Sequence, residues 1–313
     1  MSKPVLFVSG LGSSPERSEN IKAIFDAYQG DKSLVCGHMG QIEAESGRYD
    51  LMVIDVFPTY SPGKCIMIWH AIQGGKYIGL DQKGSYYRPE YARFIDRIVA
   101  AGHGGAKMMS QCTGVAENKV LNLGMPRTDR YIGKRKGDGH TGLTDTRVYL
   151  YVPTFRGRTD TPMPDVDFDL IDRLLMDDEV MVVKPHPYGQ KMWLSGYKHI
   201  VEVNKMAPSV NYLYDCDVVI TDYSSIIFDG YLLNKPAVLF EKEKGYVQSR
   251  GMYMAYPDGY CSRYAKTEKE LIRKIRTADK LTILETMVRA YVADACDGHS
   301  CERICDLIEE MRR

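Results

Sequence analysis

The sequence lacks any apolar run of the roughly 18 or more residues that a membrane-spanning helix needs, and it has no excess charge of either sign. Lysine plus arginine and aspartate plus glutamate both number 41, so the formal net charge is zero. No overall field therefore draws the protein to nucleic acid or to an acidic membrane. We expect no nucleic-acid partner, and any bound anion must be held by local groups.

The cysteines and the amino terminus exclude two further classes of protein. Eight cysteines are scattered through 313 residues, which argues against a disulfide scaffold. The chain reaches Gly10 after too few apolar residues for a secretory signal. We therefore expect a cytoplasmic protein with reduced thiols.

Several familiar signatures are also missing from the sequence. There is no P-loop, no G-x-S-x-G elbow, no H-E-x-x-H and no G-x-G-x-x-G after a first strand. Cys296, Cys301 and Cys305 are not spaced as a zinc knuckle, and thiols on a helix face explain them better. We expect neither a metal nor a cofactor.

Short apolar runs rich in β-forming residues alternate with loops and amphipathic stretches along the whole chain. Strands are predicted at 5–8, 51–56, 65–69, 95–100, 120–123, 148–152, 180–184, 199–203, 217–221 and 237–241. Helices are predicted at 16–28, 168–176, 222–233, 267–278 and 301–312. Such alternation is typical of parallel sheets covered by helices on both faces. A polar, glycine-rich segment at 133–145 interrupts it, so we predict an α/β fold with domains at 1–140 and 146–313, the last helix being free to pack back on the first domain.

The segment around the strand 217–221 contains the first candidate site. The strand runs into Asp222, Tyr223, Ser224 and Ser225 and then into a helical pattern. Such a turn presents free backbone N–H groups and the positive end of the helix dipole, which suit a phosphate. The alternative is ordinary capping of the helix, with Asp222 as the cap, and spacing alone gives it at least equal weight.

Lys184 and His186 follow a second predicted strand. The neighbouring Pro185 and Pro187 hold this segment extended, at the edge of an open sheet where ligands usually bind. A loop histidine with one structural hydrogen bond is the alternative interpretation.

His70 follows a third predicted strand and precedes a loop with two consecutive glycines and Lys76. A histidine can exchange a proton near neutral pH, so His70 is a candidate general base. The glycines let the backbone approach a ligand, and Lys76 could face an anion. The alternative is that His70 packs against Trp69.

Three arginines at predicted strand ends, Arg127, Arg156 and Arg158, could bind phosphate through paired N–H donors. Surface pairing with Asp129 or Asp160 is the alternative interpretation.

Taken together, these segments resemble the CDP-glycerol glycerophosphotransferase family, cytoplasmic enzymes that build teichoic acid and related polymers. The likeness covers most of the chain in short pieces that occur in register: Trp69-His70-Ala71 with Lys76 and Gly79, Gly124 to Asp129, Val152 to Arg156, Lys184 to Pro187, Ile220 to Ile226 with Phe228 and Asp229, Lys235-Pro236, Arg250-Gly251 and Asp297-Gly298. The resemblance implies a GT-B-like fold, in which two Rossmann-like domains face each other across a cleft.

The resemblance also implies a reaction. CDP-glycerol or CDP-ribitol would bind mainly to the second domain, and a hydroxyl of a lipid-linked sugar or a polyol-phosphate chain would attack it from the side of the first domain, with CMP leaving. By the same likeness both histidines are catalytic: His70 is the base, and His186 is the second functional histidine, near the donor phosphates. Candidate ligands of those phosphates are Ser224, Ser225, Lys184, Thr221 and Asp222. Further candidates for substrate contact are Lys76, Arg127, Thr154, Arg156 and Arg250.

Several alternatives stay open. Ala71 stands where many members have glycine and looks more like the priming branch, so a primase and a polymerase both fit. A lipid-linked acceptor would require a small apolar patch or a partner that recruits the protein to the inner face of the membrane. The candidate faces are 16–28 and 86–97, but ordinary amphipathic packing explains both segments better. The other functions considered are a sugar-nucleotide glycosyltransferase of the same architecture and a non-catalytic nucleotide-binding module. The run from Thr221 to Ser225 argues against the first, and the two histidines with the two serines argue against the second.

Overall fold

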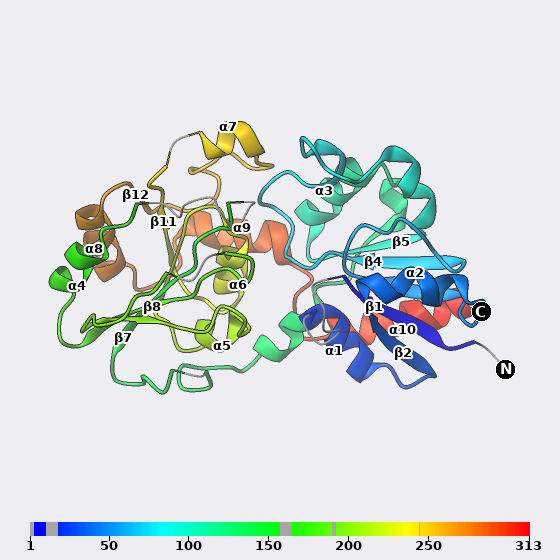
Figure 1. Ribbon diagram of the computed structural model, residues 1–313, viewed down its shortest axis with the longest axis horizontal. Coiled ribbons are helices and arrows are strands. Elements are labelled where there is room, and N and C mark those ends of the chain that lie inside the picture. Colours follow the sequence, from blue (N-terminus) through cyan, green and yellow to red (C-terminus); the bar gives the residue numbers. More distant parts are fainter. Residues whose placement is uncertain (1–2, 11–17, 140, 157–164, 190–191, 244) are drawn as a thin grey trace. The chain divides into compact units, whose positions relative to one another are not determined.

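The computed structural model describes residues 3–10, 18–139, 141–156, 165–189, 192–243 and 245–313. The chain divides into two compact units. Unit 1 comprises Met1–Ile132 with Ala290–Arg313, and unit 2 comprises Gly133–Arg289. Each unit is built around its own parallel sheet with helices packed against it (Figure 1). The predicted α/β architecture is therefore confirmed.

Unit 1 contains a six-stranded sheet among its described residues, in the order β2-β1-β3-β4-β5-β6. Every neighbouring pair of strands is parallel. The strands are β1 (Val5–Ser9), β2 (Lys32–Cys36), β3 (Leu51–Ile54), β4 (Lys64–Ile68), β5 (Arg97–Ala100) and β6 (Val120–Asn122). The central strands are apolar and fully buried because helices cover both faces of a parallel sheet.

The helices of unit 1 come from both ends of the chain. They are α1 (Glu19–Ala27), α2 (Gly37–Glu45), α3 (His103–Thr113) and α10 (Ser300–Arg312), with short 3₁₀ helices η2 (Gly79–Asp81), η3 (Pro89–Phe94), η4 (Glu117–Lys119) and η5 (Pro126–Tyr131). Ile21 and Ile24 of α1 are completely buried, so the apolar face of this helix packs inside the unit. The carboxylate of Asp129 accepts hydrogen bonds from the backbone N–H groups of Ser300 and Cys301, which caps α10.

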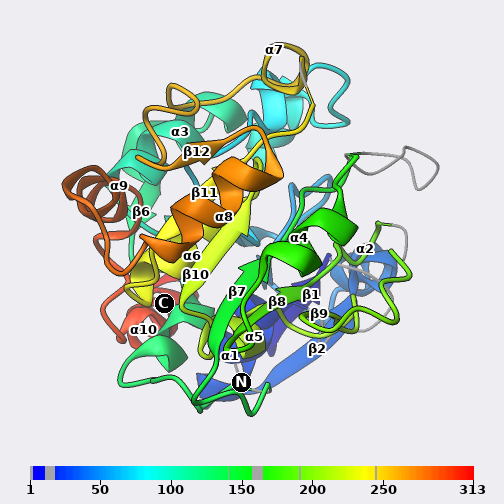
Figure 2. The same ribbon diagram turned by 90° about the vertical axis from the view of Figure 1, so that its left-hand side faces the viewer.

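Unit 2 repeats the arrangement with the strand order β12-β11-β10-β7-β8-β9, again parallel throughout in its described part. The strands are β7 (Arg147–Tyr151), β8 (Glu179–Val183), β9 (Ile200–Glu202), β10 (Val218–Thr221), β11 (Ala237–Phe240) and β12 (Tyr264–Ala265). The helices are α4 (Phe168–Leu174), α5 (Val210–Leu213), α6 (Ile226–Leu232), α7 (Tyr246–Arg250) and α8 (Glu268–Arg276), and α9 (Ile283–Ala293) begins in this unit. Figure 2 shows α4 and α8 on one face of the sheet, where Ile171 and Ile275 join its buried core.

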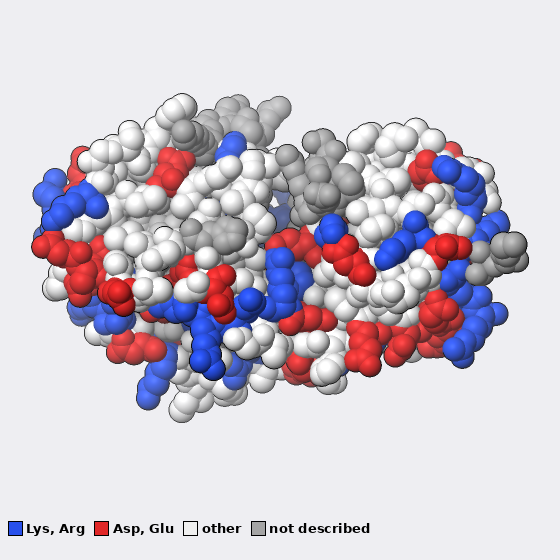
Figure 3. Space-filling view, turned by 90° about the horizontal axis from the view of Figure 1, so that it is seen from below, with Lys and Arg blue, Asp and Glu red and all other residues white. Residues whose placement is uncertain are grey.

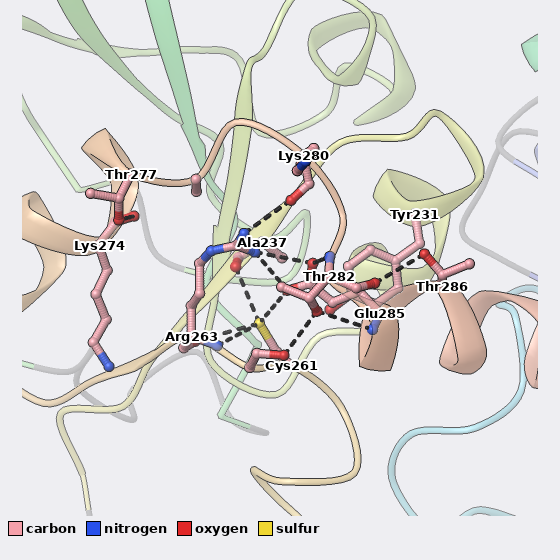
Figure 4. A network of polar contacts seen from close by, with 12 residues as sticks. Tyr231, Ala237, Cys261, Arg263, Lys274, Thr277, Lys280, Thr282, Glu285 and Thr286 are labelled. Atoms are coloured by element: carbon pink, nitrogen blue, oxygen red, sulfur yellow. Dashed lines mark hydrogen bonds and ion pairs between the residues drawn. The ribbon is translucent and has the colours of Figure 1, made fainter.

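A buried ion pair fixes the start of α9 to the end of the second sheet. Glu285 is completely buried, and both of its oxygens accept hydrogen bonds from Arg263 at 2.9 and 3.0 Å. Glu285 also accepts the backbone N–H of Thr282, and Thr282 accepts that of Glu285, the reciprocal pair of a capping box. Figure 4 shows this network together with Cys261, whose thiol donates to the carbonyl of Ala237.

All ten predicted strands are confirmed to within two residues at each end. The helix predicted at 222–233 begins later, at Ile226, because residues 222–225 form the turn after β10. The prediction did not include strands β2 and β12 or helices α2, α3, α5, α7 and α9.

The surface carries charges of both signs. In the space-filling view of Figure 3, lysine and arginine side chains are interspersed with aspartate and glutamate on the face shown. No helix in the described part of the chain has both the length and the apolar character of a membrane span.

Candidate active site

His70 lies at the carboxyl edge of the first sheet, two residues beyond the end of β4. Its ring is half-buried and contacts the ring of Trp69, with centroids 4.3 Å apart. Trp69 in turn packs on Phe57 at 4.5 Å. The contact between His70 and Trp69 that the sequence offered as the structural alternative is therefore present. It orients the imidazole and leaves part of it accessible, so it does not conflict with a role as a base.

The loop after His70 is held close to its neighbours. The side-chain oxygen of Gln73 accepts a hydrogen bond from the backbone N–H of Ala101, just beyond β5. Gly79 has φ +57°, and a Cβ there would lie 2.2 Å from the carbonyl oxygen of Cys112. Only glycine fits this close approach without a shift of the backbone. Lys76 lies between these two anchors and is half-buried.

Arg127, from η5, is brought to the same edge of the first sheet. It is only 6% exposed, and its guanidinium donates to the carbonyl oxygen of His70 at 3.4 Å. Its backbone N–H donates to the side-chain oxygen of Asn20 at 3.2 Å. Surface pairing of Arg127 with Asp129 was the alternative predicted from sequence, but the carboxylate of Asp129 instead accepts from Ser300 and Cys301.

In unit 2, one carboxylate joins the ends of two neighbouring strands. Asp222, after β10, accepts the backbone N–H of Thr154, after β7, at 2.9 Å. Its other oxygen accepts from the guanidinium of Arg156 at 2.5 Å. Arg156 also donates to Glu243 at 2.8 Å and to the carbonyl of Thr154 at 2.7 Å. Asp222 therefore does not cap α6; the cap position is Ser225, and its side chain makes no capping hydrogen bond.

Arg156 is enclosed by aromatic rings as well as by carboxylates. Its guanidinium lies 5.4 Å from the ring centre of Tyr223 and 5.1 Å from that of Tyr246, and these two rings stack on each other at 4.2 Å. Burial lowers the pKa of Arg156, but the carboxylates of Asp222 and Glu243 outweigh it and raise that pKa above its ordinary value. The pairing predicted for the exposed surface is thus a buried one with other partners, while Arg158 and Asp160 lie outside the described residues.

The Tyr223 phenol is fixed on its other side by Glu241. Burial, together with the hydrogen bond to Glu241, raises the pKa of Tyr223 well above the ordinary range of a phenol. Tyr246 opens α7, and Arg250 closes it, half-buried. Glu241, Glu243 and Tyr246 were not among the residues predicted from the sequence. The sequence signal for the two glutamates was their place at the end of a strand: Glu241 is the last residue of the strand predicted at 237–241, and Glu243 follows it.

The residues expected at the donor phosphates fall into two groups. Ser224 and Ser225 are half-buried, and the Ser224 hydroxyl accepts the backbone N–H of Ile226 at 3.4 Å. Thr221 is completely buried, and its hydroxyl donates to the carbonyl of Val152 at 2.6 Å. Thr221 and Asp222 therefore hold β10 against the end of β7, whereas the two serines lie at the surface of the turn.

His186 follows β8 at the same carboxyl edge. Its ring stacks on Phe155, with centroids 5.2 Å apart and planes 13° apart. Its Nδ1 accepts the backbone N–H of Tyr188 at 3.2 Å. A ring nitrogen that accepts a hydrogen bond carries no proton, so the neutral imidazole holds its proton on Nε2.

Lys184 is only 1% exposed. Its ammonium group donates to the carbonyl oxygens of Pro185 and Lys205 at 3.1 and 2.8 Å. These bonds fix the extended segment that carries His186. In the described part of the chain no group of three or more histidine, cysteine, aspartate or glutamate side chains is arranged to hold a metal ion.

Comparison with known protein families shows which family this chain belongs to. The family model described as CDP-Glycerol:Poly(glycerophosphate) glycerophosphotransferase matches residues 49–310. The chain belongs to this family. The matched region of this glycerophosphotransferase family member includes both histidines and both serines described above.

Curated relatives of this family member differ in the polyol they name. A teichoic acid poly(ribitol-phosphate) polymerase of Bacillus spizizenii is 27% identical over 291 residues, which cover 82% of this chain and 46% of the polymerase. A teichoic acid glycerol-phosphate primase of Bacillus subtilis is 28% identical over 266 residues, covering 79% of this chain and 68% of the primase. The chain thus spans about half the length of that polymerase.

Solved structures support the fold. The wall teichoic acid polymerase TagF matches with a TM-score of 0.79 and 19% identity, covering 99% of this chain and 89% of that one. A UDP-GlcNAc 2-epimerase from Neisseria meningitidis matches with a TM-score of 0.61 and 11% identity, covering 98% of this chain and all of that one. At these identities the likeness concerns the fold alone, and it identifies the glycerophosphotransferase family member as a GT-B-like α/β protein.

Proposed function

We propose that this protein transfers glycerol phosphate or ribitol phosphate from a CDP-polyol to an acceptor hydroxyl and releases CMP, in the synthesis of teichoic acid or a related polymer. The observation that carries the proposal is the family match over residues 49–310. His70, His186 and the two serines lie within the matched range and follow strands of the two parallel sheets, which supports the proposal because open α/β folds bind ligands at the carboxyl edges of their strands.

His70 would act as the general base. The oxygen of the acceptor hydroxyl forms a bond to the β-phosphorus of the donor, the bond from that phosphorus to CMP breaks, and the hydroxyl proton passes to the imidazole. An alcohol loses its proton with difficulty near neutral pH, and a positioned base typically contributes about 10²- to 10⁴-fold. The half-buried ring of His70, packed on Trp69, suits this task.

The donor phosphates would be bound in unit 2. The hydroxyls of Ser224 and Ser225 and the Nε2 proton of His186 can all donate to phosphate oxygens, and the charge on the leaving CMP is balanced there. We assign Thr221, Asp222 and Lys184 to the support of these groups, since each already binds a backbone group of its own unit.

For both histidines to serve one turnover, the two units would have to face each other across a cleft that holds the donor. Hydrogen exchange tests this directly. CDP-glycerol should slow exchange in the segments that follow both β4 and β8. Protection confined to the segment after β8 would contradict a shared site.

The substrate is tested by incubating the purified protein with a lipid-linked disaccharide and CDP-glycerol, CDP-ribitol or a UDP-sugar. We expect CMP from a CDP-polyol and no UDP from the sugar nucleotides, and mass spectrometry of the product reports the polyol, the acceptor and the number of units added. UDP release with sugar transfer would instead establish a glycosyltransferase. Sedimentation with vesicles, with and without the lipid-linked acceptor, tests peripheral membrane contact.

Two substitutions separate the proposed roles. His70→Ala should lower kcat about 10²- to 10⁴-fold and leave the affinity for CDP-glycerol almost unchanged. Ser224→Ala should weaken CDP-glycerol binding by about 1–3 kcal/mol in calorimetry, the usual value of a hydrogen bond to a charged group. Turnover that survives in His70→Ala would remove the assignment of the base.

A further inference from the structure

Asn20 occupies the second position of α1 and is 1% exposed, although asparagine is a polar residue that usually lies at a surface. Both ends of its side-chain amide are engaged. The nitrogen donates to the carbonyl oxygen of Trp69 at 3.1 Å, and the oxygen accepts the backbone N–H of Arg127 at 3.2 Å. These two bonds fix which way the amide points, and they leave it as the link between two distant loops.

Both of these loops contact His70. Trp69 is the residue before His70, and its ring packs on the imidazole. Arg127 reaches back from its own loop and donates to the carbonyl oxygen of His70 at 3.4 Å. The carbonyls on both sides of the Cα of His70 are therefore bound, one by Asn20 and one by Arg127.

The same helix is held to η5 by a second contact. Glu19, the neighbour of Asn20, forms an ion pair with Arg130. That pair is partly exposed, with side chains 26% and 45% accessible, and contributes little by itself. Glu19 is adjacent to Asn20 on α1, and Arg130 lies three residues after Arg127 on η5, so the two elements are joined at two positions.

We propose that Asn20 and Arg127 are positioning residues that set the place of the His70 imidazole. This inference rests on the proposed function, because it assigns them a role through the base. It also gives Arg127 a different role from the phosphate contact expected from its sequence. A buried asparagine is needed because alanine would leave the Trp69 carbonyl and the Arg127 N–H unsatisfied, and aspartate could not donate to the carbonyl.

Steady-state kinetics of Asn20→Ala and Asn20→Asp test the proposal. We expect kcat to fall by up to about 100-fold, the cost of misplacing a catalytic group by about 1 Å. The KM for CDP-glycerol should stay within about twofold, because the donor phosphates are assigned to unit 2. Arg127→Met should also lower kcat, but by less than the Asn20 variants, since it keeps the backbone N–H that binds Asn20.

A matched control separates positioning from stability. Ser18→Ala removes the side-chain cap of the same helix, where the Ser18 hydroxyl accepts the N–H of Ile21 at 3.2 Å, and should lower the midpoint of urea unfolding. It leaves the bonds of Asn20 in place, so kcat should stay near that of the wild type. An equal fall of kcat in Ser18→Ala and Asn20→Ala would overturn the proposal.

The double variant gives the second criterion. If Asn20 acts only through His70, Asn20→Ala should have no further effect on the residual rate of His70→Ala. Additive losses would contradict the positioning role. The outcomes also separate the two proposals. Full turnover in His70→Ala refutes the base itself, whereas loss in His70→Ala with wild-type kcat in Asn20→Ala refutes only the inference about Asn20.

Discussion

Arg156 and Asp222 form an ion pair at the carboxyl edge of the second sheet, and their side chains are only 4% and 2% exposed. Asp222 also binds the backbone of Thr154, and Arg156 also binds Glu243. The pair therefore ties together the segments that follow β7, β10 and β11. Ser224 and Ser225 follow Asp222 after one intervening residue, Tyr223, so the pair anchors the start of the turn that carries the two hydroxyls.

The first prediction concerns removal of this pair. Arg156→Met leaves the buried carboxylate of Asp222 without its cation, beside the partly exposed carboxylate of Glu243, and should cost about 3–5 kcal/mol of unfolding free energy in urea titration. Arg48→Met is the control, because Arg48 is 62% exposed in its pair with Glu43 and should cost less than about 1 kcal/mol. Equal losses in the two variants would show that the buried pair does not order the edge of the sheet.

The second prediction concerns the tautomer of His186. Because Nδ1 accepts the N–H of Tyr188, only Nε2 can donate to a phosphate from the neutral ring. His186→Gln retains a donor at the end of the side chain, so its kcat/KM for CDP-glycerol should exceed that of His186→Ala by about tenfold, the value of roughly 1.4 kcal/mol. If the two variants are equally slow, the role of His186 does not depend on donating from that position.

The third prediction is a pH dependence of stability in unit 2. Burial alone would raise the pKa of Glu179, but hydrogen bonds from Arg276 and Tyr149 outweigh it and lower the pKa from its ordinary value of 4.5 to about 2. A carboxyl with a lowered pKa stabilises the fold above its unfolded value and loses that contribution as the pH falls through the folded value.

Glu179→Gln should therefore be less stable than the wild type at neutral pH, and the difference should shrink as the pH falls from about 4.5 towards 2. Urea titrations at several pH values measure it. Glu302→Gln, at a side chain that is 72% exposed, serves as the control and should show little difference at any pH. A difference between Glu179→Gln and wild type that stays constant over this range would contradict the pairing.

The fourth prediction concerns Gly79. Alanine there would need a positive φ and would bring its Cβ to 2.2 Å from the carbonyl oxygen of Cys112. Gly47 has a similar φ of +73°, with nothing within 4 Å of its Cβ position. Gly47→Ala should cost only the conformational strain, about 1–2 kcal/mol, and Gly79→Ala clearly more, as thermal unfolding would show. Equal losses of stability in the two variants would mean that the backbone at Cys112 moves away from the new Cβ at no cost in free energy.

The sequence was most informative for elements that a local pattern of residues is sufficient to predict. The runs at Val5–Ser9 and Val218–Thr221 are apolar on both faces, which is the pattern of a central parallel strand, and both were predicted. The helix α3 (His103–Thr113) was missed, because Gly104 and Gly105 lie in its first turn and glycine disfavours helices. Tertiary packing explains why glycine stands at both positions: a Cβ on Gly104 would meet the ring of Tyr291, and a Cβ on Gly105 would meet Gln73.

By itself the sequence determined that the chain forms two α/β units with parallel sheets. It also determined that His70, His186 and the two serines follow the ends of strands. Both could be predicted because hydrophobic periodicity and short motifs are local properties of the chain. Only the tertiary structure decided the partners of the charged and polar groups. Arg156 binds Asp222 and Glu243, and Asn20 binds Trp69 and Arg127, across separations of 49 to 107 residues. Such pairs form because a buried polar group must find a partner wherever the fold brings one within reach, and no local pattern records which one that is.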